Sequence, residues 1–336
     1  MASSIRVSGW NNRYSMSAPT ELTPATRKRR VSQLEYQVDE LYTPQSFARR
    51  AVSSMTQARY PVVAVFVLAL IALCALFAPQ LAPKDPNRVE IFETLKPPLT
   101  YDRKGEFEFI LGTDSTGRDV LSRVIYGARI SFFVGLAAVG LGGGAGTILG
   151  LTAGYLGGRV DDVIMRLADI QLAYPFILFA IMMLTILGEG VLNLVLVLGI
   201  GQWVTYARIA RAETLVQRER EFVEAVRALG ATEARIMLRT ILPNILTPLI
   251  VIASFNVAGV ILSEASLSFL GLGVPESVPT WGAMLANSRN QLLSGSWWLA
   301  VFPGLAIMFT VVSLNILGDW MRDFLDPRLR GSGQGL

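Results

Sequence analysis

Six long apolar stretches, separated by charged segments, dominate the hydropathy pattern of this chain. A helix that crosses the roughly 30 Å hydrocarbon layer of a membrane needs about 20 mostly apolar residues, and each stretch approaches or exceeds that length. The pattern therefore predicts an all-α, polytopic membrane protein with six transmembrane helices. The predicted spans cover residues 60–83, 130–158, 164–188, 190–207, 240–263 and 290–318. The third and fourth spans are separated only by Gly188-Glu189-Gly190, which predicts a tight turn and a helical hairpin.

The distribution of Lys and Arg predicts the orientation of these spans. Nine basic residues lie in residues 1–59 and seven arginines lie in residues 208–239, whereas the Gly188–Gly190 turn has none. By the positive-inside rule both termini, including the 321–336 tail, are expected in the cytoplasm. The loop 84–129 carries eight basic and eight acidic residues, and we assign it to the outer side despite its basic residues.

The region before the first span is polar. Residues 1–30 lack apolar periodicity and predict disorder, while residues 31–41 show helical spacing. Phe47, Ala51 and Met55 repeat that spacing beside several arginines, which favours a short helix in the cytoplasmic membrane interface. A soluble helix that packs on a partner is the alternative. Because the first long apolar run begins only at residue 60, a cleavable signal peptide is not expected.

Composition excludes several classes of function. The chain is 52% apolar and only 17% charged, against roughly 25% charged in soluble domains. It has no histidine and one cysteine, so His-based catalysis and an internal disulfide are excluded. No lysine is followed by Ser or Thr, which excludes a phosphate-binding P-loop. The net charge is +4, and most of the basic residues lie on the predicted cytoplasmic side, as the positive-inside rule expects. Nucleic acid is therefore not an expected partner.

The second span contains a row of glycines at four-residue spacing. Its members are Gly142, Gly146, Gly150, Gly154 and Gly158. Such a row leaves a groove on one helix face that lets another helix approach closely. It therefore predicts helix packing rather than phosphate binding.

Two carboxylates at predicted span boundaries are candidates for function, since charges in membranes are costly. Asp169 lies near Asp161, Asp162 and Arg166, which favours a solvated or salt-bridged role over proton or substrate handling. Glu264 begins the outer segment 264–289 and is a candidate for the translocation path.

The segment 264–289 is too apolar for a free loop and too short to cross the bilayer, which favours partial insertion among the spans. Trp297 and Trp298 then follow, and this pair is typical of the outer membrane interface.

The stretch from residue 208 to residue 239, called here the charged segment, predicts a helix-turn-helix in the cytoplasm. Gly230 breaks the helix, the Thr232 hydroxyl is placed to cap a second one, and Pro243 falls in the first turn of the next span. The expected apolar face comprises Ala207, Ala210, Leu215, Phe222, Val226 and Leu229.

The charged segment carries a recognisable spacing. Glu224, Ala225, Gly230, Leu242 and Pro243 resemble the EAA-x3-G-x9-I-x-L-P signature of membrane subunits of bacterial ABC importers. Two positions depart from it, because Val226 replaces the second Ala and Thr240 replaces the Ile.

Further motifs extend the resemblance over most of residues 60–330. They are residues 111–123 (LGTDSTGRDVLSR), 154–158 (GYLGG), 267–273 (LSFLGLG), 281–282 (WG) and 325–328 (LDPR). Together they look like the C-type permease subunit of oligopeptide and dipeptide ABC importers.

This resemblance implies a type I importer fold in a bacterial plasma (inner) membrane and a transport subunit that is not itself an enzyme. The EAA helix would dock on a cytoplasmic ATPase, with Glu224 at the docking surface and Gly230 at the sharp turn. The implied partners are a homologous permease subunit, two ATPase subunits or a fused ATPase, and an extracytoplasmic peptide-binding protein. ATP and Mg²⁺ would be held by the ATPases, and no cofactor is expected here.

Alternatives remain open from the sequence. Nickel or another small solute is a second substrate class, and the permease pair is either a heterodimer or a homodimer. A proton-coupled secondary transporter is a different class, although no mid-span carboxylate or internal repeat points to one.

Overall fold

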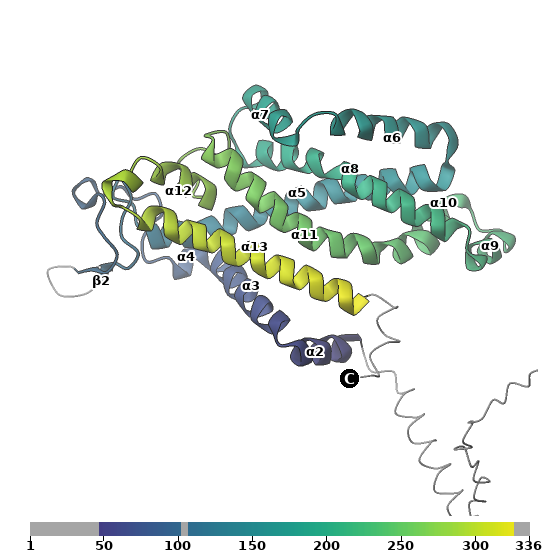
Figure 1. Cartoon of the computed structure of the whole chain (residues 1–336), viewed down its shortest axis with the longest axis horizontal. Coiled ribbons are helices and arrows are strands. Elements are labelled where there is room, and N and C mark those ends of the chain that lie inside the picture. The colour runs from purple at the N-terminus through teal and green to yellow at the C-terminus, as the bar shows by residue number, and fades with distance from the viewer. Residues whose placement is uncertain (1–46, 102–106, 326–336) are drawn as a thin grey trace, which may run out of the picture. The chain divides into compact units, whose positions relative to one another are not determined.

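The computed structural model describes residues 47–101 and 107–325, and its long elements are all helices (Figure 1). Residues 53–325 belong to one compact unit. The helices are α2 (Phe47–Ala58), α3 (Tyr60–Leu76), α4 (Ala78–Leu81), α5 (Val120–Leu156), α6 (Gly158–Leu172), α7 (Phe176–Leu187), α8 (Val191–Arg218), α9 (Glu221–Ala228), α10 (Glu233–Arg235), α11 (Leu242–Phe269), α12 (Trp281–Ser288) and α13 (Trp298–Leu325).

Short elements join the helices. Two 3-10 turns, η1 (Ile91–Glu93) and η3 (Leu292–Ser294), lie before α5 and α13, and a π-helical turn, η2 (Ile236–Ile241), leads into α11. Strands β1 (Thr100–Tyr101) and β2 (Phe107–Phe109) form an antiparallel pair. The predictions for residues 1–46, and for 326–336 with most of the 325–328 motif, lie outside the described residues.

Helices α5, α8, α11 and α13 run side by side, with α9 at one end of the bundle and α12 at the other (Figure 1). Large aliphatic side chains such as Leu198, Ile245 and Ile261 are fully buried between them. Many Leu, Val, Ile and Phe side chains on the outside are exposed, for example Phe66 and Ile186. This arrangement is typical of a helical bundle that faces lipid, and it confirms the all-α membrane fold.

Among the described residues, four helical stretches are long and apolar enough to cross a membrane. They are Val120–Leu156, Val191–Arg218, Glu233–Phe269 and Trp298–Leu325. The pair α6 and α7 passes the same test only when it is taken together, and α3 is shorter, at 17 residues. The predicted count of six spans and the orientation of the termini stay predictions.

The third predicted span, 164–188, is not one straight helix. It consists of α6 and α7, which are bent by 88° relative to each other. Pro175 lies at the break, where it lacks an N–H group and disfavours a helical conformation for Tyr174. The predicted turn at Gly188-Glu189-Gly190 is present, and both glycines have positive φ angles.

The helices differ in extent from the predicted membrane spans, whose own bounds stay predictions. α5 begins at Val120, ten residues before the span at 130–158, α8 continues to Arg218 beyond the span that ends at 207, and α13 begins at Trp298, after the start of the span at 290. The first span is interrupted at Phe77, between α3 and α4. The reason is that a charge-free stretch marks the apolar part of a helix, whereas the helix itself continues into water wherever its polar groups are satisfied.

The two tryptophans predicted as a pair at the membrane interface have different surroundings. The Trp297 side chain is 52% exposed, whereas that of Trp298 is 7% exposed and packs with Val120 and Met284. The Trp298 indole N–H also donates a hydrogen bond to the Thr113 carbonyl at 3.2 Å. Trp298, at the start of α13, therefore packs against the loop that precedes α5 and does not face lipid.

Candidate functional site

The charged segment folds as the end of α8, then α9, a turn at Gly230, and α10 with η2. Gly230 has a φ angle of 81° and donates a hydrogen bond to the Arg227 carbonyl at 2.9 Å, while Ala231 donates to the Val226 carbonyl at 3.3 Å. No atom outside the turn lies within 4 Å of where a Cβ at Gly230 would be. The turn therefore requires glycine for its backbone conformation and not for space.

The two faces of α9 differ. Val223 is fully buried and Val226 packs on the core, whereas Phe222 is 42% exposed and Leu229 is 87% exposed. The predicted apolar face was wrong for Phe222 and Leu229, because α8 and α9 are separate helices and no single periodicity runs through both. Glu224 is exposed too, but two positions after Phe222 it lies on a different side of α9, whereas Phe222 and Leu229, seven positions apart, share one side.

The five signature residues fall into two groups on either side of η2. Glu224 and Ala225 are exposed on α9, and Gly230 forms the turn that follows that helix. Leu242 and Pro243 open α11, directly after the π-helical turn. Proline lacks the N–H group that would continue the helical hydrogen bonding, and a π turn, a rare conformation, directly precedes it. The structure does not test whether these residues contact an ATPase, so that role stays a prediction.

The predicted cap at Thr232 was wrong in its details. Thr232 precedes α10, but its hydroxyl makes no capping hydrogen bond. The Ile236 N–H instead reaches the Thr232 carbonyl at 3.0 Å, because the three-residue α10 leads straight into η2.

Sequence reasoning missed the anchors that hold the charged segment. The Tyr155 hydroxyl, near the end of α5, donates a hydrogen bond to the Glu233 carboxylate on α10, and Arg227 on α9 donates to the same hydroxyl at 3.5 Å. Arg218, at the end of α8, donates to the Gly154 carbonyl at 2.9 Å. The only feature of the sequence that pointed to these contacts was the position of Tyr155 within the 154–158 motif.

The glycine row lies against α8. A Cβ atom on Gly142, Gly146, Gly150 or Gly154 would lie 2.2 to 2.7 Å from a backbone carbonyl oxygen of α8. These oxygens belong, in the same order, to Gly199, Trp203, Ala207 and Arg211. The glycines of α5 and the carbonyl groups of α8 both advance by four residues in the same direction along the chain. The two helices therefore run parallel, and their rows of residues at four-residue spacing pack against each other. Gly158, by contrast, has no atom within 4 Å of its Cβ position.

Glu264 lies inside α11, which continues to Phe269 beyond the predicted end of the fifth span at 263. Its side chain is completely buried, and it accepts hydrogen bonds from Ser268 at 2.8 Å and from Ser131 on α5 at 3.3 Å. Glu264 therefore joins α5 to α11 in this conformation. Its role on a translocation path stays a prediction.

Asp169, the other candidate carboxylate, accepts a hydrogen bond from Arg208 at 2.7 Å, and both side chains are about half exposed. This is the salt-bridged arrangement that the sequence favoured.

At the other end of the bundle, an ionic network holds the loop before α5 against the turn before α12. The Arg118 guanidinium lies between Asp114, at 2.6 Å, and Glu276, at 2.8 Å. Burial raises the pKa of the Asp114 carboxyl. Hydrogen bonds from the Arg118 backbone N–H and guanidinium lower that pKa by a larger amount, so it lies below the ordinary value for an aspartate. Asp114 is thus held as a carboxylate.

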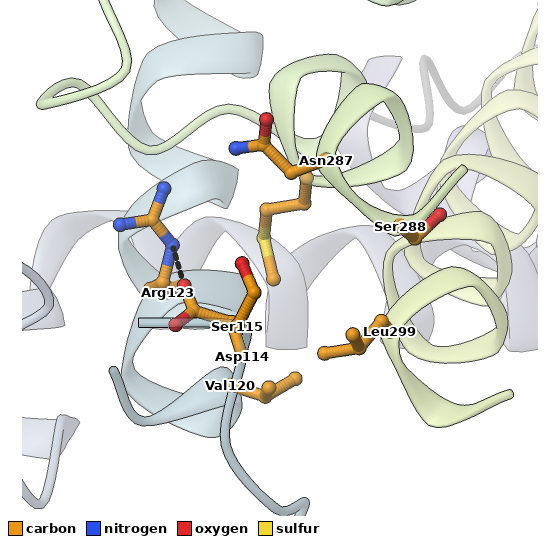
Figure 2. A pocket seen from close by; sticks show the side chains of 8 residues that line it. Asp114, Ser115, Val120, Arg123, Asn287, Ser288 and Leu299 are labelled. Atoms are coloured by element: carbon orange, nitrogen blue, oxygen red, sulfur yellow. Dashed lines mark ion pairs between the residues drawn. The ribbon is translucent and has the colours of Figure 1, made fainter. Parts of the chain in front are cut away.

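A small cavity of about 20 Å³ lies beside this network (Figure 2). Figure 2 shows Asp114 and Arg123 on one side of it and Asn287 and Ser288, from α12, on the other. The volume is that of about one water molecule, so the cavity is too small for a transported solute.

A wider groove, of about 830 Å³, opens between α8, α11 and α13. Its polar lining residues include Glu213, Asn244, Thr247 and Arg322, and Pro248 and Phe255 line it as well. Sequence reasoning did not single out these residues, because their polarity is ordinary until the three helices bring them together. Across the described ranges, no group of three or more His, Cys, Asp and Glu side chains is placed to hold a metal ion.

Comparisons with known proteins agree with this architecture. Residues 146–331 match the family of binding-protein-dependent transport system inner membrane components, and residues 46–98 match the N-terminal transmembrane domain of oligopeptide transport permease C. The chain belongs to the first of these families and is an inner-membrane transport subunit. That membership also sets aside a proton-coupled secondary transporter.

Particular relatives are permeases by name. The chain is 43% identical to the di/tripeptide transport system permease protein DppC of Pseudomonas aeruginosa, over 78% of this chain and 86% of that protein. It is 40% identical to the dipeptide transport system permease protein DppC of Haemophilus influenzae, over 79% and 89%. The inward-facing MetNI methionine ABC transporter aligns at 19% identity with a TM-score of 0.46, over 60% of this chain and 94% of that chain.

Proposed function

We propose that this chain is one of two membrane subunits of an ATP-driven importer for dipeptides and short oligopeptides. The single observation that carries the coupling role is that α9 is a short helix with Phe222 and Glu224 exposed, ended by the left-handed Gly230 turn, with Leu229 exposed just before that turn. The chain has no P-loop of its own, so an energy source must reach it from outside. Exposed apolar side chains and an exposed carboxylate on one short helix suit docking into a groove of a partner, with the charge fixing the register.

The proposed assembly contains a homologous permease subunit as heterodimer partner, two cytoplasmic ATPase subunits or a fused pair, and an extracytoplasmic peptide-binding protein. ATP and Mg²⁺ are held by the ATPases, and this chain holds no cofactor. Closure of the ATPases moves α9 and shifts the pore between inward and outward access, as expected for a two-state element biased by a ligand.

The peptide substrate is proposed from the relatives, which are named as dipeptide and di/tripeptide permeases. The test is uptake of radiolabelled alanyl-alanine into liposomes that contain the complete complex, ATP and the binding protein. Saturable uptake that unlabelled dipeptides and tripeptides inhibit, and Ni²⁺ does not, supports the proposal. Uptake of radioactive nickel instead, or no uptake of the dipeptide, overturns the peptide assignment.

A further inference from the structure

The inner end of α5 is held by the three helical pieces of the charged segment. Arg218 from α8 binds the Gly154 carbonyl, while Arg227 from α9 and Glu233 from α10 both bind the Tyr155 hydroxyl. Arg227 and Glu233 flank the Gly230 turn, so one hydroxyl group connects both sides of that turn to α5.

The other end of α5 is held just as closely. The Trp281 indole of α12 donates to the Val124 carbonyl at 3.0 Å, and a Cβ atom on Gly127 would lie 2.8 Å from the Trp281 ring. Between the two ends α5 has 37 residues and no proline, so it spans about 55 Å as one continuous helix.

We propose that Tyr155 is a positioning residue that transmits a displacement of α9 to α5, and through α5 to α12. This inference rests on the proposed function, because it takes α9 as the surface that the ATPases move. Tyr155 is buried, and its ring packs in the core of the bundle. Its hydroxyl donates to a carboxylate and accepts from a guanidinium, and such charge-assisted hydrogen bonds are stronger and more directional than neutral ones. No other hydrogen bond recorded for the described residues joins α5 to α9 or α10.

The test uses the complete complex in liposomes, with binding protein loaded from a mixture of dipeptides. ATP hydrolysis and peptide uptake are measured together. Tyr155→Phe removes only the hydroxyl, so basal hydrolysis is expected to stay within twofold of wild type. Uptake per ATP hydrolysed is expected to fall at least fivefold. Tyr174→Phe, whose side chain is 65% exposed, is the matched control and is expected to behave as wild type.

Variants of Glu233 separate transmission from simple packing. Glu233 is exposed, so its substitution leaves the core intact. Glu233→Ala is expected to lose uptake per ATP as Tyr155→Phe does, and the double variant to be no worse than either single one. Glu233→Gln keeps an acceptor for the hydroxyl and is expected to retain more than half of the wild-type ratio. If Tyr155→Phe does not assemble, the contrast between Glu233→Ala and Glu233→Gln decides.

Wild-type uptake per ATP in Tyr155→Phe or in Glu233→Ala overturns the inference, and so do additive losses in the double variant. The proposed function is judged on the wild-type complex alone. If loaded binding protein does not stimulate hydrolysis there, the proposed function fails. If wild type is stimulated and Tyr155→Phe is equally coupled, only the inference about Tyr155 fails.

Discussion

Gly150 lies directly against Ala207: a Cβ atom on the glycine would stand 2.2 Å from the carbonyl oxygen of the alanine. Gly146 and Gly142 have the same relationship to carbonyl groups one and two turns earlier on α8, respectively. In a membrane the helices gain little hydrophobic energy from association, since lipid is equally apolar, and close packing of small residues takes its place. The glycine row therefore sets the distance between α5 and α8.

The first prediction concerns this packing. Gly150→Ala forces the two helices apart and is expected to lower the free energy of unfolding by about 1–3 kcal/mol, the usual cost of overpacking. Thermal unfolding in detergent micelles measures the change. Gly144→Ala is the matched control, because it is on the same helix with no atom within 4 Å of its Cβ position. Equal melting temperatures for the two variants would show that the contact with α8 does not limit stability.

The second prediction concerns the turn after α9. Gly230 has a φ angle of 81°, and a β-branched side chain there costs about 1–2 kcal/mol. Gly230→Val is expected to reach the membrane in normal amount but to lose most of the ATPase stimulation by loaded binding protein. Gly230→Asn is the control, because asparagine tolerates positive φ, and it is expected to retain stimulation. The opposite ranking of Val and Asn would rule out a conformational requirement at this turn.

The third prediction concerns the charge on α9. Glu224→Lys reverses an exposed charge on the proposed docking surface and is expected to abolish both uptake and stimulated ATP hydrolysis, with normal insertion. Glu224→Gln removes the charge without reversing it and is expected to lose less, because like-charge repulsion is absent. Wild-type activity of Glu224→Lys in liposomes would refute the docking role of this residue.

The fourth prediction concerns pH and the Asp114–Arg118–Glu276 network. Because the pKa of Asp114 lies below its ordinary value of 3.8, its stabilising effect is complete above that value. The effect is lost as the pH falls through the lowered pKa. The protection factor for amide hydrogen exchange in residues 84–119, which is the exchange rate corrected for its intrinsic dependence on pH, is therefore expected to be constant from about pH 7 to pH 5 and to fall only below about pH 4.

Asp114→Asn provides the comparison for that measurement. It removes one partner of a buried ion pair, which costs about 3 kcal/mol, and faster exchange is expected already at pH 7. If the loop amides of the variant and of the wild type have equal protection factors at pH 7, the network does not hold the loop.

The fifth prediction concerns orientation. Single cysteines are placed at two exposed positions in a Cys74→Ala background: Ser115, in the cavity that α12 lines, and Thr232, directly before α10. α12 and α10 lie at opposite ends of the bundle (Figure 1). On intact cells an impermeant maleimide is expected to label Ser115→Cys, and to label Thr232→Cys only after the cells are opened. Labelling of Thr232→Cys alone would reverse the predicted orientation.

The apolar pattern predicted the helices better than it predicted their ends. It located the hairpin turn at Gly188–Gly190 and the start of α11 near Pro243, where turn and helix-breaking residues act locally. It failed at Pro175, which lies inside an apolar run that reads as continuous although the chain bends there by 88°. Hydropathy records which side chains prefer lipid, and it does not record the direction of the backbone.

By itself the sequence determined an all-helical membrane protein, the glycine row as a packing face and the left-handed turn at Gly230. Each of these depends on residues within a few turns of one helix. Only the tertiary structure decided that Tyr155 meets Glu233, 78 positions away, and that Arg118 meets Glu276, 158 positions away. Such meetings depend on how far one helix slides and rotates against another. That register is set by the packing of all the helices together, which no single segment encodes.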